Sequence, residues 1–173
     1  IMEQPIIAGV AHDLGDAKIT VVGVPDRPGM AAAIFQAVAD AGINMDMIVQ
    51  NVSVHESGAT DVTFTCPRGD AAKAELALRR IEKDVNFKDI DTDENIAKIS
   101  LVGAGMRSHP GVSATFFKAI ADAGVNVEMI STSEIRISVV TRAEDATKAV
   151  TAIHSAFGLD ADGEAVVYGG TGR

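Results

Sequence analysis

Lys18-Ile19-Thr20-Val21-Val22-Gly23 decides the fold of this chain, because it returns as Lys98-Ile99-Ser100-Leu101-Val102-Gly103. The stretch Ala-Val-Ala-Asp-Ala-Gly-Ile-Asn at 37–44 likewise returns at 119–126 as Ala-Ile-Ala-Asp-Ala-Gly-Val-Asn. The period, roughly 80 residues, is too long for a solenoid repeat. The sequence therefore predicts two copies of one small domain.

Each copy carries the hydrophobic patterning of a βαββαβ unit. The elements expected in the first copy are a strand at 18–24, a helix from Ala31 ended by Gly42, a strand at 43–53, a strand at 62–66, a helix capped by Asp70 and a weak strand at 85–90. Those expected in the second copy are a strand at 99–103, a helix carrying Phe116 and Ile120, strands starting at Val127 and at Ile135, a helix carrying Ala146 to Phe157, and a last strand at 163–168 before a frayed tail.

This element order is the ferredoxin-like plan, with helices on one face of an antiparallel sheet. We therefore expect an α+β protein whose first domain spans 15–93 and whose second spans 94–173. The segment 5–11 lies outside both copies and could add a strand to either sheet. We favour the second sheet, which leaves the first copy as an insertion within the second. The fold alone does not decide the function.

Composition excludes several classes of partner. The net charge is -9 and the Lys and Arg residues do not cluster. Nucleic acid and anionic membranes need a positive surface, so neither is expected to bind. A single cysteine, Cys66, fits a reducing cytoplasm. We find no signal peptide and no apolar run near the ~20 residues that span a bilayer.

The strongest candidate site is the loop between the first strand and first helix of each copy. It reads Asp26-Arg27-Pro28-Gly29-Met30-Ala31 in the first copy, and Pro110-Gly111 occupies the same place in the second. The amides of a first helical turn suit a carboxylate, and Asp26 suits an ammonium group. Together they fit the head of an amino acid. Pro-Gly is also an ordinary helix-start turn, but its presence in both copies favours the ligand.

Two further candidates are polar. Asn44 and Asn126 each follow a helix cap and offer an amide to a ligand, although Asn also favours turns. Ser131-Thr132-Ser133-Glu134 is a hydroxyl-rich run that is either a ligand contact or a hairpin turn. Gln50 and Ser53 occupy the matching region of the first copy.

Catalytic and metal sites are not expected. The four histidines lie apart without ligand spacing, and no Ser-His-Asp or Cys-His set can be assembled. An RNA-binding ferredoxin-like module is a weak alternative, because its sheet needs exposed aromatics and the strands here carry only Phe64. An enzyme of another type lacks paired titratable groups. A binding or regulatory role remains.

Two motifs in the first copy, Asp26-Arg27-Pro28-Gly29 and Ala41-Gly42-Ile43-Asn44, resemble those of the ACT domain, a ferredoxin-like amino-acid sensor. More narrowly, the stretches at 98–106 and 131–138 resemble the tandem ACT regulatory region of aspartokinase. The resemblance covers nearly the whole chain and does not include that family's amino-terminal kinase domain. Some members make the regulatory part as a separate β subunit from an internal start, with which Met2 is consistent.

The resemblance implies feedback inhibition by threonine, with lysine as a second candidate, and no cofactor. It also implies a homodimer through ACT units and an α2β2 enzyme with a catalytic α subunit. An ACT module of another amino-acid biosynthetic enzyme is the alternative. The expected effector site combines two sets of residues, the second contributed by another chain. They are Asp26, Arg27, Pro28, Gly29, Met30, Ala31, Asn44, Met45, Asp46 and Gln50, and then Val112, Ser113, Asn126, Val127, Ser133 and Glu134.

Overall fold

The chain divides into two compact units. The computed structural model describes residues 6–52, 58–106, 109–159 and 166–170. The first unit comprises residues 16–94, and the second comprises the residues up to Gly15 together with those from Asn95 onward. The first unit is therefore an insertion in the sequence of the second.

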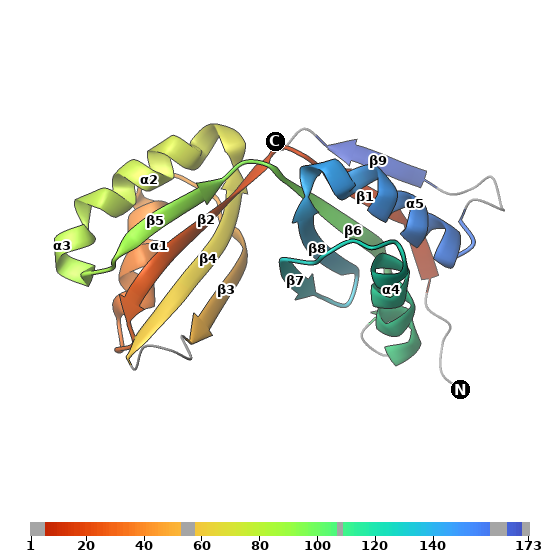
Figure 1. Cartoon of the computed structure of the whole chain (residues 1–173), viewed down its shortest axis with the longest axis horizontal. Helices are drawn as coiled ribbons and strands as arrows, with labels where there is room; N and C mark the ends of the chain where they lie inside the picture. The colour runs from red at the N-terminus through yellow and green to blue at the C-terminus, as the bar shows by residue number, and fades with distance from the viewer. Residues whose placement is uncertain (1–5, 53–57, 107–108, 160–165, 171–173) are drawn as a thin grey trace. The chain divides into compact units, whose positions relative to one another are not determined.

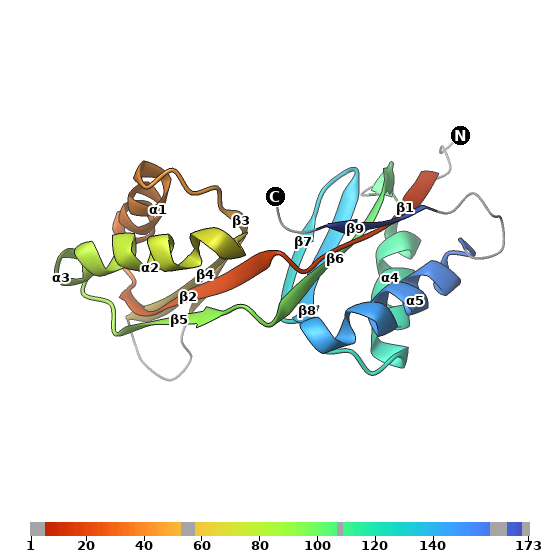
Figure 2. The same ribbon diagram turned by 90° about the horizontal axis from the view of Figure 1, so that it is seen from above.

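The first unit is a four-stranded sheet with helices on one face. Its strands and helices are β2 (Asp16–Pro25), α1 (Met30–Asp40), β3 (Asp46–Val52), β4 (Ala59–Pro67), α2 (Ala71–Arg80), the short α3 (Glu82–Val85) and β5 (Asp89–Asp93). The strand order is β3-β4-β2-β5, and every neighbouring pair is antiparallel. Figures 1 and 2 show α1 and α2 on the same side of this sheet. The predicted ferredoxin-like arrangement is confirmed.

The core of the first unit is aliphatic, as its alternating strands predict. Ile19 and Val21 of β2 point toward the helices and are fully buried, and Ile34 of α1 and Leu78 of α2 meet them from the other side. Phe64 of β4 is the largest fully buried side chain among the described residues of this unit. Burial of each such side chain contributes about 1.5–3 kcal/mol, which holds the helices on this face.

The second unit has a five-stranded sheet. Its elements are β1 (Ile6–Asp13), β6 (Ile96–Ala104), α4 (Pro110–Asp122), β7 (Met129–Thr132), β8 (Arg136–Arg142), α5 (Ala146–Ala156) and β9 (Val166–Gly170). The strand order is β7-β8-β6-β1-β9, with β1 antiparallel to β6 and β9 parallel to β1. The amino-terminal strand thus takes the place beside β6 that β5 takes beside β2.

The same alternation fills the second core. Val10 of β1 and Leu101 of β6 are fully buried against Phe116 of α4 and Ile153 of α5. Phe116 also meets Phe117 edge to face, with ring centroids 5.2 Å apart. Because Val10 is part of this core, β1 is integral to the second unit.

The structure corrects the predicted end of the first copy. Residues 85–90 were expected to form its last strand, but Val85 ends α3 and the strand β5 begins at Asp89. Asn86 stops the helix in the left-handed conformation, with φ 62°. Val85 and Phe87 are buried side chains that close the core at this end, so their hydrophobicity does not indicate a strand.

Helix ends also differ from expectation. Asp70 makes no side-chain capping hydrogen bond, because a 3-10 turn, η1 (Arg68–Asp70), precedes α2 and gives Asp70 helical angles. Gly42 has φ +77° and its counterpart Gly124 has φ +75°, which confirms the predicted left-handed end of the first helix. The last strand was expected at 163–168; β9 begins at Val166 and includes two glycines assigned to the tail, and 163–165 lie outside the described residues.

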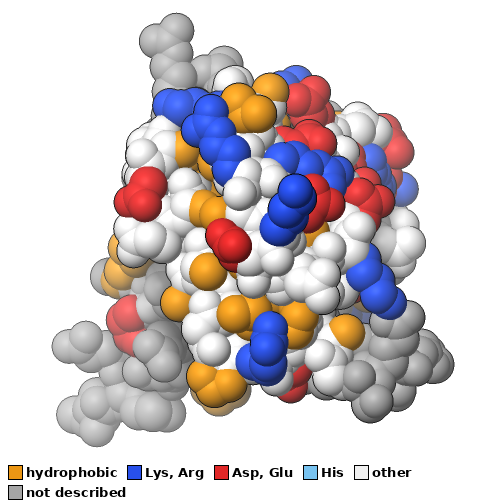
Figure 3. All heavy atoms as spheres, turned by 90° about the vertical axis from the view of Figure 1, so that its left-hand side faces the viewer, with side chains coloured by type: hydrophobic (Ala, Val, Ile, Leu, Met, Phe, Trp, Pro, Cys, Tyr) orange, Lys and Arg blue, Asp and Glu red, His pale blue; other side chains and the backbone are white. Residues whose placement is uncertain are grey.

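The described surface carries both signs of charge. Figure 3 views the first unit, where Lys and Arg side chains are interspersed with Asp and Glu side chains. Within the described ranges, no helix is long and apolar enough to cross a membrane.

Candidate functional site

In the first unit, the loop between β2 and α1 is held by its backbone. The amide of Asp26 donates to the carbonyl of Gly58 at 2.8 Å, and the amide of Met30 donates to the carbonyl of Arg27 at 3.3 Å. The side chain of Asp26 is exposed, as are Arg27, Pro28 and Gly29. Asp26 is therefore exposed just ahead of α1, and its role as a partner for an ammonium group stays a prediction.

The backbone conformation at position 29 requires a glycine. Its φ is +93°, which disfavours any residue with a Cβ, while a Cβ built there would meet nothing within 4 Å. The glycine therefore allows the turn, and the space around it is open in the chain alone.

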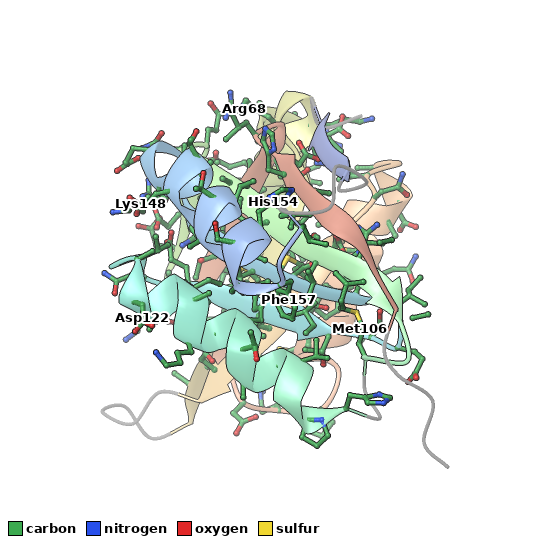
Figure 4. The ribbon with its side chains drawn as sticks, turned by 90° about the vertical axis from the view of Figure 1, so that its right-hand side faces the viewer. Arg68, Met106, Asp122, Lys148, His154 and Phe157 are labelled. Atoms are coloured by element: carbon green, nitrogen blue, oxygen red, sulfur yellow. The ribbon has the colours of Figure 1, made fainter. Side chains whose placement is uncertain are left out.

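In the second unit, the matching loop borders a pocket of about 230 Å³. The pocket is lined by Met106, Pro110, Ser113, Thr132, Ser133 and Ile137. The structure thus brings together two predicted site residues, Ser113 on α4 and Ser133 after β7. Met106, which follows β6 and is labelled in Figure 4, is buried and lines this pocket.

One wall of this pocket is the turn of the hairpin that joins β7 and β8. The amide of Ser133 donates to the carbonyl of Arg136 at 2.7 Å, and its hydroxyl lies 3.4 Å from the same carbonyl and 3.4 Å from the amide of Ile135. The amide of Met106 donates to the carbonyl of Glu134 at 3.1 Å. The run is therefore both the turn and the pocket wall, so the two interpretations of the sequence are compatible.

Not every predicted residue faces this space. The side chain of Val112 is buried in the second core, and its amide already donates to the carbonyl of His109 at 3.0 Å. Met30 packs partly against the first core. Val112 and Met30 therefore position the helix starts.

Asn44 to Asp46 and Asn126 to Val127 lie far from the helix starts of their own units. Asp46 pairs with Thr65 at one end of β4, whereas Val52 pairs with Thr60 at the other end, beside the loop that carries Asp26. α1 has 11 residues, so its ends are about 16 Å apart. Within one unit, the structure does not bring the asparagines to the helix start.

The strand register also changes one assignment. Gln50 faces Val62 on β4, and Thr132 faces Ile137 on β8, at the same point of the repeat. The first-copy residue that matches Ser133 is consequently Asn51. Ser53 was expected there and lies outside the described residues. A repeat comparison that counted from Asn44 and Asn126 would have found Asn51.

Residues that the sequence interpretation missed are those of the longer second loop. His109 Nδ1 lies 2.7 Å from the carbonyl oxygen of Gly105, which has φ +72° and bends the chain ahead of α4. Met106 lines the pocket without having been assigned to the site, whereas Thr132 belongs to the hydroxyl-rich run already named as a candidate. The extra length of this loop relative to the first copy was the available signal.

Neither a metal site nor a reactive thiol is found in the part of the chain that the structure describes. No group of three His, Cys, Asp or Glu side chains there could hold a metal ion. Burial, reinforced by the charges of Asp70 and Asp16, raises the pKa of the Cys66 thiol to about 11. Such a thiol is a poor nucleophile at neutral pH.

Comparisons with known proteins agree with the two-unit fold. ACT domain family models match residues 18–86 and residues 99–157, one in each unit. The structure of the ligand-free regulatory subunit of aspartate kinase from Thermus thermophilus superposes with a TM-score of 0.83 at 43% identity, covering 88% of this chain and 99% of that one. The chain belongs to the aspartokinase regulatory family.

Two other relatives of this aspartokinase regulatory chain bear on its context. A structure of aspartokinase alpha and beta subunits matches with a TM-score of 0.81 at 44% identity, over 87% of this chain and 98% of that one. Aspartokinase from Mycolicibacterium smegmatis is 55% identical over 172 residues, which are 99% of this chain and 41% of that protein. The chain spans about two fifths of the length of the curated relatives it matches.

Proposed function

We propose that this chain is the non-catalytic regulatory part of an aspartokinase. It binds an end-product amino acid, threonine in the first instance, between ACT units of two chains, and so inhibits aspartate phosphorylation. The single observation that carries this proposal is the helix-start site present in both units, with hydroxyl groups of Ser113 and Ser133 gathered in the second.

Exposed edge strands support pairing between chains. β3 and β7 are edge strands of the two sheets, and Ile48 and Ile130 occupy the same place in the repeat. Their side chains are 50% and 51% exposed. An unpaired edge with large apolar side chains favours the addition of another strand. We therefore place the homodimer interface at these edges, with each sheet continuing into that of the partner subunit.

Antiparallel pairing of β3 with the partner subunit's β7 would complete both sites. The helix start at Asp26 and the nearby Gln50 would lie beside the partner subunit's Asn126 and Val127. Equally, the pocket at Ser113 and Ser133 would lie beside the partner subunit's Asn44 and Asp46. This arrangement explains why the predicted residues are separated within one unit.

The chemistry of the second pocket favours threonine over lysine. Its described lining offers three hydroxyl groups and no charged side chain. The hydroxyl of a threonine ligand can exchange hydrogen bonds with these groups, whereas the additional side-chain ammonium of lysine would need an acidic partner of its own. Pro110 has no amide N–H and that of Val112 already donates to His109, so we assign the ligand carboxylate to the exposed amide of Gly111.

Regulation then follows from linkage. A ligand bound between two chains stabilises the associated state by RT ln(1 + [L]/Kd), about 2.7 kcal/mol at a hundredfold excess over Kd. That energy inhibits a kinase domain, attached or supplied as an α subunit in an α2β2 enzyme, if the inhibited state binds the effector more tightly. Placement in the cytoplasm, with the enzymes of amino-acid biosynthesis, belongs to the same proposal.

The test is calorimetric titration of the chain with threonine and lysine, singly and together, with light scattering of the same samples. We expect threonine to bind and to increase the dimer fraction. Asp26→Ala should weaken binding by about 1–3 kcal/mol, because an ammonium partner is lost, whereas Asp40→Ala, at the far end of α1, should not. A chain that binds neither amino acid but binds a different one would instead support the ACT module of another biosynthetic enzyme.

A further inference from the structure

A second pocket, of about 220 Å³, lies between β1 and the amino-terminal half of α5. It shares no lining residue with the pocket at Ser113 and Ser133. Its lining comprises His12, Leu14, Ala143, Ala146, Thr147, Val150 and Thr151. His12 and Leu14 follow the buried Val10 at alternate positions, so all three face α5. Figure 4 shows this helical side of the second unit, with α5 across the sheet and Lys148 on its first turns.

His12 carries an unsatisfied polar atom here. Its Nδ1 is buried and has no hydrogen-bond partner among the described residues. Buried polar atoms in folded proteins are nearly always hydrogen-bonded, and an exception calls for an explanation such as an absent ligand. Because His12 also lines the pocket, a polar group bound there is a candidate for the missing partner.

Polar side chains from α5 also line the pocket. Thr147 and Thr151 are one helical turn apart on α5 and are exposed. The pocket thus has polar groups on two opposing elements.

The lining defines the chemistry of an occupant. The imidazole and the two threonine hydroxyls can all donate hydrogen bonds, and none of the lining residues is acidic. Leu14, 41% exposed, and Val150 offer an apolar surface to the body of the ligand. We propose that this pocket binds a small aliphatic carboxylate, whose oxygens accept hydrogen bonds from His12 and the threonines. The pocket is smaller than a typical drug-sized site, so an occupant of about five to eight non-hydrogen atoms fits.

This ligand differs from the amino acid of the helix-start sites. An α-ammonium group would find no carboxylate among the lining residues, and its burial would be unfavourable. The inference is therefore independent of the proposed feedback function.

The experiment uses three probes of one shape, 3-methylbutanoate, 3-methylbutan-1-ol and 3-methylbutylamine. Each is titrated into the full chain while the ring signals of His12 are followed by NMR. We expect saturable shifts with the carboxylate and a Kd at least tenfold lower than those of the alcohol and the amine. Equal binding of the alcohol, preferred binding of the amine, or no saturable shift would overturn the proposal.

Variants assign the binding to this pocket. Thr151→Val keeps the shape of an exposed side chain and should raise the Kd for 3-methylbutanoate at least threefold. His12→Phe should raise this Kd at least tenfold. Because that variant lacks the His12 ring signals, its binding is measured from the shift of the Thr151 methyl signal. Ser133→Ala, in the other pocket, is the matched control and should leave the Kd unchanged. Unchanged affinity in Thr151→Val and His12→Phe, with the fold confirmed by NMR, would contradict the proposal.

Discussion

At the residue scale, the two Pro-Gly motifs look alike in sequence and differ in backbone. Gly29 precedes α1 with φ +93°, whereas Gly111 lies in the first turn of α4, where its φ is not positive. Neither position has a neighbouring atom within 4 Å of an added Cβ. The repeat alone predicts equal roles for the two glycines, and only the backbone angles separate them.

Alanine should therefore have opposite effects at the two positions. Gly29→Ala is expected to lower the free energy of unfolding by about 1–2 kcal/mol, the cost of left-handed backbone for a residue with a Cβ. Gly111→Ala should raise it by up to about 0.5–1 kcal/mol, because alanine favours a helix. Urea denaturation of both variants measures the difference. Equal effects would show that the two loops share one conformation.

Burial of the Cys66 thiol should lower the stability of the fold at alkaline pH. Its pKa rises from 9.0 to about 11 on folding, so the folded state holds the proton more tightly than the unfolded state. Stability is therefore retained below pH 9 and is lost as the pH rises from 9 toward 11. Cys66→Ala should be less stable at pH 7 but should show a shallower loss over that window. Thermal unfolding of both proteins from pH 7 to 11 makes the comparison, and parallel curves would contradict it.

At the scale of elements, periodicity predicted most helices and strands but not how far apart their ends lie. The apolar spacing that predicts α1 and α4 is confirmed, and so are the left-handed glycines after them. The separation of Asn44 from Asp26 depends on strand register and helix length, which a motif list does not contain. Val85 was assigned to a strand because, in the sequence, a single apolar residue before a turn does not show whether it ends a helix or begins a strand.

The edge strands give a prediction about association. A lysine in place of Ile48 or Ile130 would place a charge on the edge of β3 or β7 and should disrupt strand addition. We expect each variant to be mainly monomeric at concentrations where the unaltered chain is a dimer. Leu76→Lys, at an equally exposed apolar position on α2, is the control and should leave the dimer intact. Sedimentation velocity distinguishes these outcomes, and dimers in both isoleucine variants would place the interface elsewhere.

At the scale of the whole molecule, the order of the units along the chain makes them unequal. Residues 16–94 contain every strand of the first sheet, whereas the second sheet needs β1 from before the insertion. A fragment of residues 16–94 should therefore fold cooperatively, and one of residues 95–173 should not, since it lacks Val10 and the strand beside β6. Linking residues 1–15 directly to 95–173 by a short flexible linker should restore folding. Circular dichroism melts of the three fragments test this, and a stable fold for 95–173 alone would remove β1 from the core.

The last prediction joins a single side chain to the regulation of the whole enzyme. Ser133 lies at the wall of a pocket of about 230 Å³, where a phenylalanine ring would occupy the space proposed for the effector. Because Ser133 is exposed, Ser133→Phe should fold, and in a reconstituted aspartokinase it should raise the threonine concentration needed for half-inhibition at least tenfold. Ala72→Phe, on the exposed side of α2, controls for added bulk and should be inhibited like the unaltered enzyme. The measurement is aspartate phosphorylation with threonine and lysine added singly and together. Unaltered inhibition of Ser133→Phe would show that the effector binds elsewhere, and phosphorylation by the lone chain would show that it is itself a kinase.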